Sequence, residues 1–178
     1  MNIYLHRDDI RIHDNIGLKK ASEDDKTIPV YIDDPRIREK LGKNKEAFRK
    51  KGLSKLNDKY KDRDSKLHFI EGKIGQELKK LIEKSNVEGV YFNRSYTPLK
   101  RRIEDEIKDL NIKTESFKDR LLVEPEEFSC EYDTFSPFYR EWKKREKEKP
   151  FDNPENLISM PEFSDYTRQN LEASADIP

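Results

Sequence analysis

Short β-rich runs alternate with segments of helical periodicity along most of the chain, and this alternation is the strongest constraint on the fold. Between the runs, apolar residues recur at intervals of three and four, as at Leu99, Ile103, Ile107 and Leu110. Strands that alternate with helices favour right-handed βαβ units. The sequence therefore predicts an α/β domain with a parallel sheet. Its expected strands cover residues 2–6, 27–33, 67–72, 87–93 and 112–117.

Two of the helices can be placed more closely. A helix is predicted over residues 45–61, with Phe48, Leu56 and Tyr60 on one apolar face. Another follows the first strand, and either Asp14 or Asn15 can cap it, because a short polar side chain accepts a hydrogen bond from an unpaired backbone N–H group.

The end of the chain has a different composition, and this sets the predicted domain limits. The α/β domain is expected to span residues 1–130, an exit segment with a charged helix 131–149, and an interdomain linker or tail 150–178. The run "KKREKEK" has five positive and two negative charges. It could be a basic patch for nucleic acid, but a solvated helix of mixed charge is favoured. The tail is rich in Pro, Asn, Asp, Glu and Ser, which is typical of linkers.

The overall charge balance excludes some classes of protein. The chain has 37 Lys and Arg against 37 Asp and Glu, which argues against general adhesion to nucleic acid or to an anionic membrane. Cys130 is the single cysteine, so an intramolecular disulfide and a multi-cysteine metal site are excluded. No apolar run approaches the roughly 18 residues that span a bilayer. We expect a cytoplasmic protein without membrane contacts.

Polar stretches after three of the predicted strands indicate a binding site. In an open parallel sheet, ligands bind beyond the carboxyl ends of the strands. The stretches are "HRDDIR", "DDPR" and "NRSYTP", after the first, second and fourth strands. The candidate ligand-binding residues are Arg7, Asp8, Asp34, Asn93, Arg94 and Tyr96.

Each stretch also has a structural interpretation. Asp9 and Arg11 are expected to serve mainly as scaffold, paired with each other or with Asp33. "DDP" can be a plain turn, since Pro35 fixes its own φ. "NRSYTP" suits a planar heteroaromatic ligand with polar edges, or else a closed loop with Tyr96 packed inward. "GKIG" lacks the spacing of a phosphate loop and is expected to open a helix.

No residue pattern specifies catalysis. His6, His13 and His68 lie far apart in the sequence and are expected to be satisfied structural residues. No Ser/His/Asp or Cys/His arrangement is suggested. A nucleotide-binding enzyme on this sheet would need glycines after the first strand, and "HRDDIR" has none. Reasoning from the residues thus reaches a Rossmann-like binding domain with no catalytic or metal site.

Several stretches, taken in order, resemble the N-terminal domain of the DNA photolyase/cryptochrome family. "HRDDIRIHDNIGL" resembles the opening of that domain, "IPVYIDDP" its second strand and turn, and "VYFNRSYTPLKRR" its fourth strand and loop. "FKDRLLVEP" and "YDTFSPFYREW" resemble its exit. The resemblance implies a three-layer Rossmann-like domain whose five-stranded parallel sheet has the order 3-2-1-4-5.

The resemblance also implies a role in light-driven DNA repair by a deoxyribodipyrimidine photolyase. In many family members the crevice holds a light-harvesting antenna chromophore, which passes excitation to a catalytic FAD. The implied partner is an FAD-binding helical domain, from the same gene or as a separate subunit, and damaged DNA is expected to be reached only through it. The catalytic FAD is expected only in that domain, and Trp142 alone cannot form the usual tryptophan chain. The chain alone is therefore expected to be inactive in repair.

Two departures from the family pattern bear on the chromophore. Asp8 stands where the family commonly has a second Arg. Thr97 stands where folate-binding members often have a carboxylate, so a deazaflavin or FMN/FAD is favoured over folate. The alternative function is a structural or interaction module without a chromophore, which serves as a docking platform for a helical partner. The choice between photolyase and cryptochrome stays open.

Overall fold

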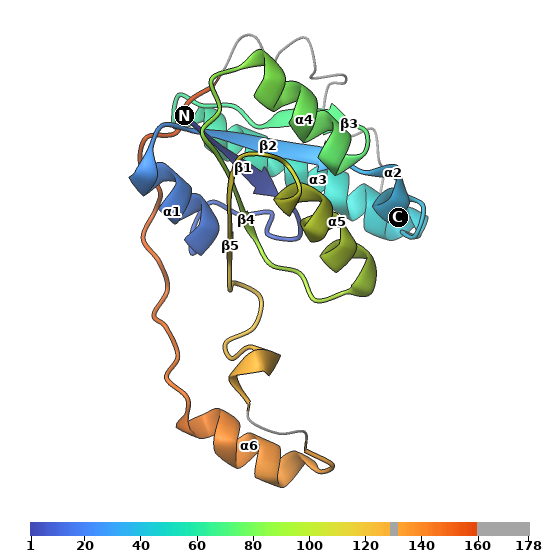
Figure 1. The fold of residues 1–178 in the computed structure, drawn as a ribbon, viewed down its shortest axis with the longest axis vertical. Coiled ribbons are helices and arrows are strands. Elements are labelled where there is room, and N and C mark those ends of the chain that lie inside the picture. The colour runs from blue at the N-terminus through green and yellow to red at the C-terminus, as the bar shows by residue number, and fades with distance from the viewer. Residues whose placement is uncertain (129–131, 160–178) are drawn as a thin grey trace.

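The computed structural model describes residues 1–128 and 132–159 (Figure 1). Cys130, and with it the predicted limit at residue 130, lies outside these residues, as does the tail beyond residue 159. A five-stranded sheet forms the centre of the domain. Its strands are β1 (Asn2–His6), β2 (Thr27–Asp33), β3 (His68–Glu71), β4 (Gly89–Asn93) and β5 (Lys113–Phe117).

The sheet is parallel throughout and has the order β3-β2-β1-β4-β5, as the family resemblance implied. The chain moves outward from β1 through β2 to β3 and then returns to the other side of β1. The strand order therefore reverses between β1 and β4, which is where ligands bind in open α/β sheets. Leu5 pairs with Phe92 across these strands, so the loops after β1 and β4 begin side by side.

Helices cover both faces of the sheet, which confirms the three-layer prediction. One hydrophobic core lies between the sheet and the fourth and fifth helices. The other lies between the sheet and the first and third helices. Side chains alternate along β1 accordingly, with Ile3 and Leu5 in the first core and Tyr4 in the second. The helices are α1 (Ile16–Asp24), α2 (Pro35–Arg38), α3 (Lys43–Lys61), α4 (Ile74–Lys84), α5 (Pro98–Lys108) and α6 (Phe135–Lys144), with a 3₁₀ turn η1 (Pro125–Glu127).

Phe48 on α3 does not lie where the sequence analysis placed it. Leu56 and Tyr60 are 2% and 0% exposed, but Phe48 is 73% exposed. With 3.6 residues per turn, Phe48 lies roughly 120° around the helix axis from Tyr60. Leu53 completes the buried face instead. The prediction of a shared apolar face was therefore wrong for Phe48.

The predicted turns at the starts of two helices are confirmed. Asn15, not Asp14, caps α1, and its side-chain oxygen accepts a hydrogen bond from the Leu18 N–H at 3.2 Å. Asp14 has φ 51°, and its carboxylate accepts a hydrogen bond from the Phe151 N–H at 3.0 Å. The "GKIG" stretch opens α4 after Lys73.

The chain after β5 leaves the sheet and later returns to it. Helix α6 lies away from the sheet, and the following residues run back along the α1 side (Figure 1). There the Thr27 N–H donates to the Asn156 carbonyl at 3.0 Å, and the Ile158 N–H donates to the Thr27 carbonyl at 2.9 Å. The first part of the predicted tail is therefore packed on the α/β domain. Within the described part of the chain, no helix has the length and apolar character needed to cross a membrane.

Candidate functional site

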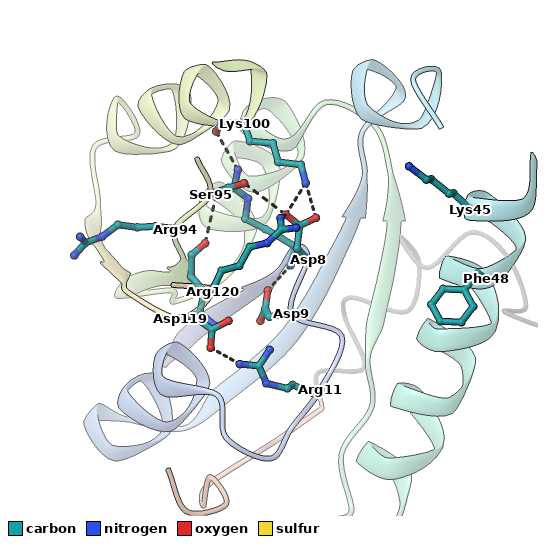
Figure 2. Close-up of a pocket in the computed structure, with 12 residues that line it drawn as sticks. Asp8, Asp9, Arg11, Lys45, Phe48, Arg94, Ser95, Lys100, Asp119 and Arg120 are labelled. Atoms are coloured by element: carbon teal, nitrogen blue, oxygen red, sulfur yellow. Dashed lines mark hydrogen bonds and ion pairs between the residues drawn. The ribbon is translucent and has the colours of Figure 1, made fainter. Parts of the chain in front are cut away.

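A pocket of about 730 Å³ lies where β1 and β4 end, with α3 on its opposite side (Figure 2). This volume is within the range of small-molecule sites, roughly 300–1,000 Å³. The lining residues come from the loops after β1, β4 and β5 and from helices α3 and α5. They are Arg7, Asp8, Asp9, Arg11, Lys45, Phe48, Asn93, Arg94, Ser95, Lys100, Asp119 and Arg120.

Arg7 is a fixed cation at the base of this pocket. Its side chain is 4% exposed and forms an ion pair with Glu104 of α5. Its Nη2 donates to the Lys100 carbonyl at 3.0 Å, and the guanidinium lies 5.6 Å from the centre of the Phe92 ring. Within the described part of the chain, the buried Nε has no hydrogen-bond partner. Arg7 thus anchors the loop after β1 to α5 and keeps one donor unused.

Asp8 brings together cations from two other elements. Its carboxylate accepts a hydrogen bond from Lys100 Nζ at 2.6 Å and forms an ion pair with Arg120 at 3.3 Å. The Ser95 hydroxyl lies 3.5 Å from the same carboxylate. The anion that departs from the family pattern is therefore compensated by neighbouring cations (Figure 2).

Asp9 belongs to a buried hydrogen-bond network beneath the pocket. Its carboxylate accepts hydrogen bonds from the Tyr4 hydroxyl at 2.5 Å, the Asn15 amide at 2.9 Å and the Arg7 N–H at 3.0 Å. Burial acts to raise the pKa of Asp9, but hydrogen bonds from His6, Tyr4 and the Arg7 backbone lower it overall. Asp9 therefore stays ionised and holds the loop.

The partners expected for Arg11 and Asp33 were wrong. Arg11 forms an ion pair with Asp119 at 2.5 Å, after β5. Asp33 is paired with Arg38 at 3.0 Å and with Arg49 at 2.8 Å. Both predictions failed because the cationic partners of Asp33 lie on helices that follow β2, and the partner of Arg11 lies more than 100 residues further along the chain.

Asn93 and Arg94 line the pocket in different ways. The buried Asn93 amide accepts from the Gly17 N–H at 3.1 Å and donates to Asn15 at 2.9 Å, so it joins β4 to the start of α1. Arg94 is more exposed and pairs with Glu124 at 2.6 Å.

Asp34 and Tyr96 do not line this pocket. Asp34 caps α2 and accepts hydrogen bonds from Arg36 at 2.7 Å and from the Ile74 N–H at 3.0 Å. The Tyr96 hydroxyl donates to Glu124 at 2.6 Å, and burial together with this bond raises its pKa. Ligand contacts by these two residues stay predictions, and the structure brings the other four candidates together.

Sequence reasoning missed the side of the pocket opposite the strands. Phe48 and Lys45 project from α3 toward the strand ends (Figure 2). Lys100 and Arg120, which were also missed, line the pocket on the side that faces α3. The candidates had been taken only from the loops after the first, second and fourth strands, whereas Lys45, Phe48 and Lys100 lie on helices and Arg120 follows β5. Phe48 had been assigned to the core. The lysines and arginine around Phe48 in "KNKEAFRKK" were the available signal that this aromatic is exposed.

The arrangement suits a planar aromatic ligand with an anionic group. Phe48 offers an exposed ring, and the lining residues include six cations and three carboxylates. Lys45 forms no ion pair within the described part of the chain, so its charge is available to a ligand. The described residues contain no cluster of three or more potential metal ligands.

Comparison with known sequences identifies the family. The family model for DNA photolyase matches residues 2–155. The deoxyribodipyrimidine photo-lyases of Synechococcus sp. and Agrobacterium fabrum are 25% and 28% identical to the chain, over 89% and 88% of its length. The matches cover 35% of each photo-lyase. The chain therefore spans about a third of the length of these relatives.

Solved structures share the fold. An archaeal photolyase from Sulfolobus tokodaii with two FAD molecules superposes with a TM-score of 0.79 at 24% identity, over 96% of this chain and 42% of that one. The Synechocystis cryptochrome superposes with a TM-score of 0.81 at 21% identity, over 90% of this chain and 37% of that one. Taken with the match over residues 2–155, these likenesses show that the chain belongs to the DNA photolyase/cryptochrome family and corresponds to its N-terminal, Rossmann-like domain.

Proposed function

We propose that this chain is the chromophore-binding part of a light-driven DNA photolyase and that it binds a flavin or deazaflavin in the pocket between α3 and the ends of β1 and β4. The observation that carries the proposal is the 73% exposed ring of Phe48 opposite a cationic wall. An exposed ring gains by stacking on a planar heteroaromatic system. The Sulfolobus photolyase, described with two FAD molecules and a light-harvesting cofactor, supports a flavin.

Each part of the pocket has a role in this proposal. Phe48 stacks on the ring system, and Lys45 and Arg120 bind a phosphate. Arg7 fixes the loop after β1 against α5 through its ion pair with Glu104. Asp9 keeps the loop after β1 in place. When bound, the chromophore would absorb light and pass excitation to the FAD of a partner domain, so the residues here bind and orient it.

Folate is a weaker candidate than a flavin. Thr97 is the exposed N-cap residue of α5 and does not line the pocket. It supplies a hydroxyl where folate-binding relatives are expected to have a carboxylate.

The second part of the proposal is docking on an FAD-containing helical domain. An apolar groove of about 470 Å³ lies between the segment after β5 and α6, with Val123, Phe138 and Trp142 in its lining. Beside it, Phe135 and Tyr139 are 71% and 43% exposed. Exposed apolar surface of this kind marks protein interfaces. Repair would then require both this chain and the FAD-containing domain. We place the protein in the cytoplasm, where it would reach the DNA.

Equilibrium dialysis tests chromophore binding. The chain is dialysed against FMN, FAD, a deazaflavin and a reduced folate, and retention with shifted absorbance is measured. We expect retention of flavin or deazaflavin and weaker retention of folate. If a folded chain retains none of the four, the antenna role is wrong and the alternative, an interaction module without chromophore, is favoured.

Co-purification tests docking. The tagged chain is recovered from source cells, and the recovered protein is checked for FAD absorbance and for a photolyase-family helical domain. We expect that domain with the wild type and its loss with Phe135→Ala/Tyr139→Ala. Equal recovery with the double variant would contradict docking through this face.

A further inference from the structure

Helix α3 has a local excess of positive charge that the neutral overall balance hides. Between Lys43 and Lys61 there are seven lysines and one arginine, against only Glu46 and Asp58. The helix therefore carries a formal charge of six, from eight positive and two negative side chains, in a chain whose net charge is zero.

Three of these lysines and an arginine that follows the helix form a row, here called the basic stripe, which consists of Lys51, Lys55, Lys59 and Arg63. All four residues are exposed. Each step of four residues moves the side chain about 6 Å along the helix axis and roughly 40° around it, so the four cations form an oblique row that winds along the helix surface. Arg63 follows the helix end and donates to the Lys59 carbonyl at 2.9 Å, which fixes the last cation against the helix.

No carboxylate of the described residues forms an ion pair with any residue of the basic stripe. Lysines on other helices do have such partners. These pairs are Lys20 with Glu23 at 2.9 Å, Lys79 with Glu83 at 3.9 Å, and Lys108 with Asp105 at 3.7 Å. The basic stripe is therefore charge left available for an external anion.

The run "KKREKEK", the basic patch considered from the sequence, is a weaker candidate. Lys144 pairs with Glu141 at 2.7 Å. Lys147 donates to the Arg145 carbonyl at 2.6 Å and lies 4.1 Å from the centre of the Trp142 ring. These lysines are already used within α6 and its end.

We propose that the basic stripe contacts the sugar-phosphate backbone of duplex DNA. A row of cations at regular spacing on a helix complements the evenly spaced phosphates of a duplex, and such contacts orient a protein without reading sequence. Membership of the DNA photolyase family supplies the polyanion. The basic stripe would let this domain contact DNA directly, in addition to any contact through a helical partner.

Salt-dependent DNA binding tests this proposal. Fluorescence anisotropy measures binding of a labelled 20-base-pair duplex to the whole chain from 25 to 200 mM salt. The test variant is Lys51→Gln/Lys55→Gln/Lys59→Gln. The control, Lys20→Gln/Lys79→Gln/Lys108→Gln, changes the net charge equally on other helices. Both variants keep Lys45 and Phe48 of the pocket, so both should bind FMN as the wild type does. Failure of DNA binding can therefore be distinguished from failure of the chromophore proposal.

The expected result is specific to the stripe. The slope of log affinity against log salt falls by about 2 to 3 in the test variant, because each phosphate contact contributes about 0.9, and affinity at low salt falls about tenfold or more. The control keeps the wild-type slope. The proposal is overturned if the wild type does not bind the duplex, if both variants lose affinity equally, or if vesicles with anionic lipid, but not DNA, bind through the stripe.

Discussion

Arg7 and Glu104 form an ion pair closed off from solvent, with side chains 4% and 8% exposed. The same Glu104 carboxylate accepts a hydrogen bond from the Ser95 N–H at 2.7 Å. One carboxylate of α5 thus holds both the loop after β1 and the loop after β4. The position of the pocket walls depends on this pair.

Removing this carboxylate should strongly destabilise the protein. Glu104→Gln leaves a buried guanidinium without its anion, which typically costs about 3–5 kcal/mol. The control is Glu106→Gln on the same helix, whose partner Arg36 lies near the surface, where a pair contributes about 1 kcal/mol or less. Urea unfolding measures the free energy of unfolding of both variants. An equal decrease in the two would contradict a larger contribution from the buried pair.

Two glycines in helices should respond oppositely to alanine. A Cβ at Gly17 would lie 2.5 Å from the Asn93 side-chain oxygen, so Gly17→Ala must displace Asn93 and destabilise the protein. At Gly52 the Cβ would make an ordinary contact at 3.5 Å with Ile10. Gly52→Ala should therefore stabilise by up to about 1 kcal/mol, since alanine favours helix. Thermal unfolding compares them, and stabilisation by both changes would contradict the close approach at Gly17.

The sequence was sufficient for the fold because its signals were local and periodic. Strand alternation, the Asn15 cap and the turn before α4 all depend on neighbouring residues. The order of the strands came from the family resemblance, whereas the loops after β1 and β4 were identified from the polar residues that follow the predicted strands.

The rest of the pocket depends on contacts between distant residues. Arg11 meets Asp119, and Asp8 meets Lys100 and Arg120, across separations that no local pattern encodes. Phe48 was misplaced because an aromatic at roughly helical spacing usually belongs to the core. Its neighbours in sequence could have shown the exposure, but not the pocket that it faces.

Buried His68 should make stability depend on pH. Burial, with a smaller contribution from Lys66, lowers the pKa of His68 to about 4. The unfolded chain takes up this proton near pH 6.5, so protonation favours unfolding as the pH falls from 6.5 toward 4. The free energy of unfolding should drop by about 3 kcal/mol over this range. Urea unfolding at several pH values should show a smaller drop in the free energy of unfolding for His68→Asn than for the wild type. The same pH dependence in both proteins would contradict the attribution to His68.

Asp8 should limit the binding of phosphate in the pocket. Its carboxylate engages Lys100 and Arg120. Asp8→Asn frees both cations, so the affinity for FMN should rise about threefold to tenfold, while riboflavin, which has no phosphate, should bind as before. The control is Asp105→Asn, which makes the same charge change on α5, outside the lining of the pocket. If both flavins gain equally, or if the control gains as much, Asp8 does not act on the phosphate.

The most direct test of the chromophore proposal is the affinity for FMN of the wild type, Phe48→Ala and Asn44→Ala, measured by fluorescence titration. Both substitutions lie on the exposed side of α3, and only Phe48 lines the pocket. We expect that FMN binds the wild type, that Phe48→Ala weakens binding about tenfold through lost stacking, and that Asn44→Ala has no effect. Unchanged binding by Phe48→Ala, or no binding by the wild type, would contradict the proposal.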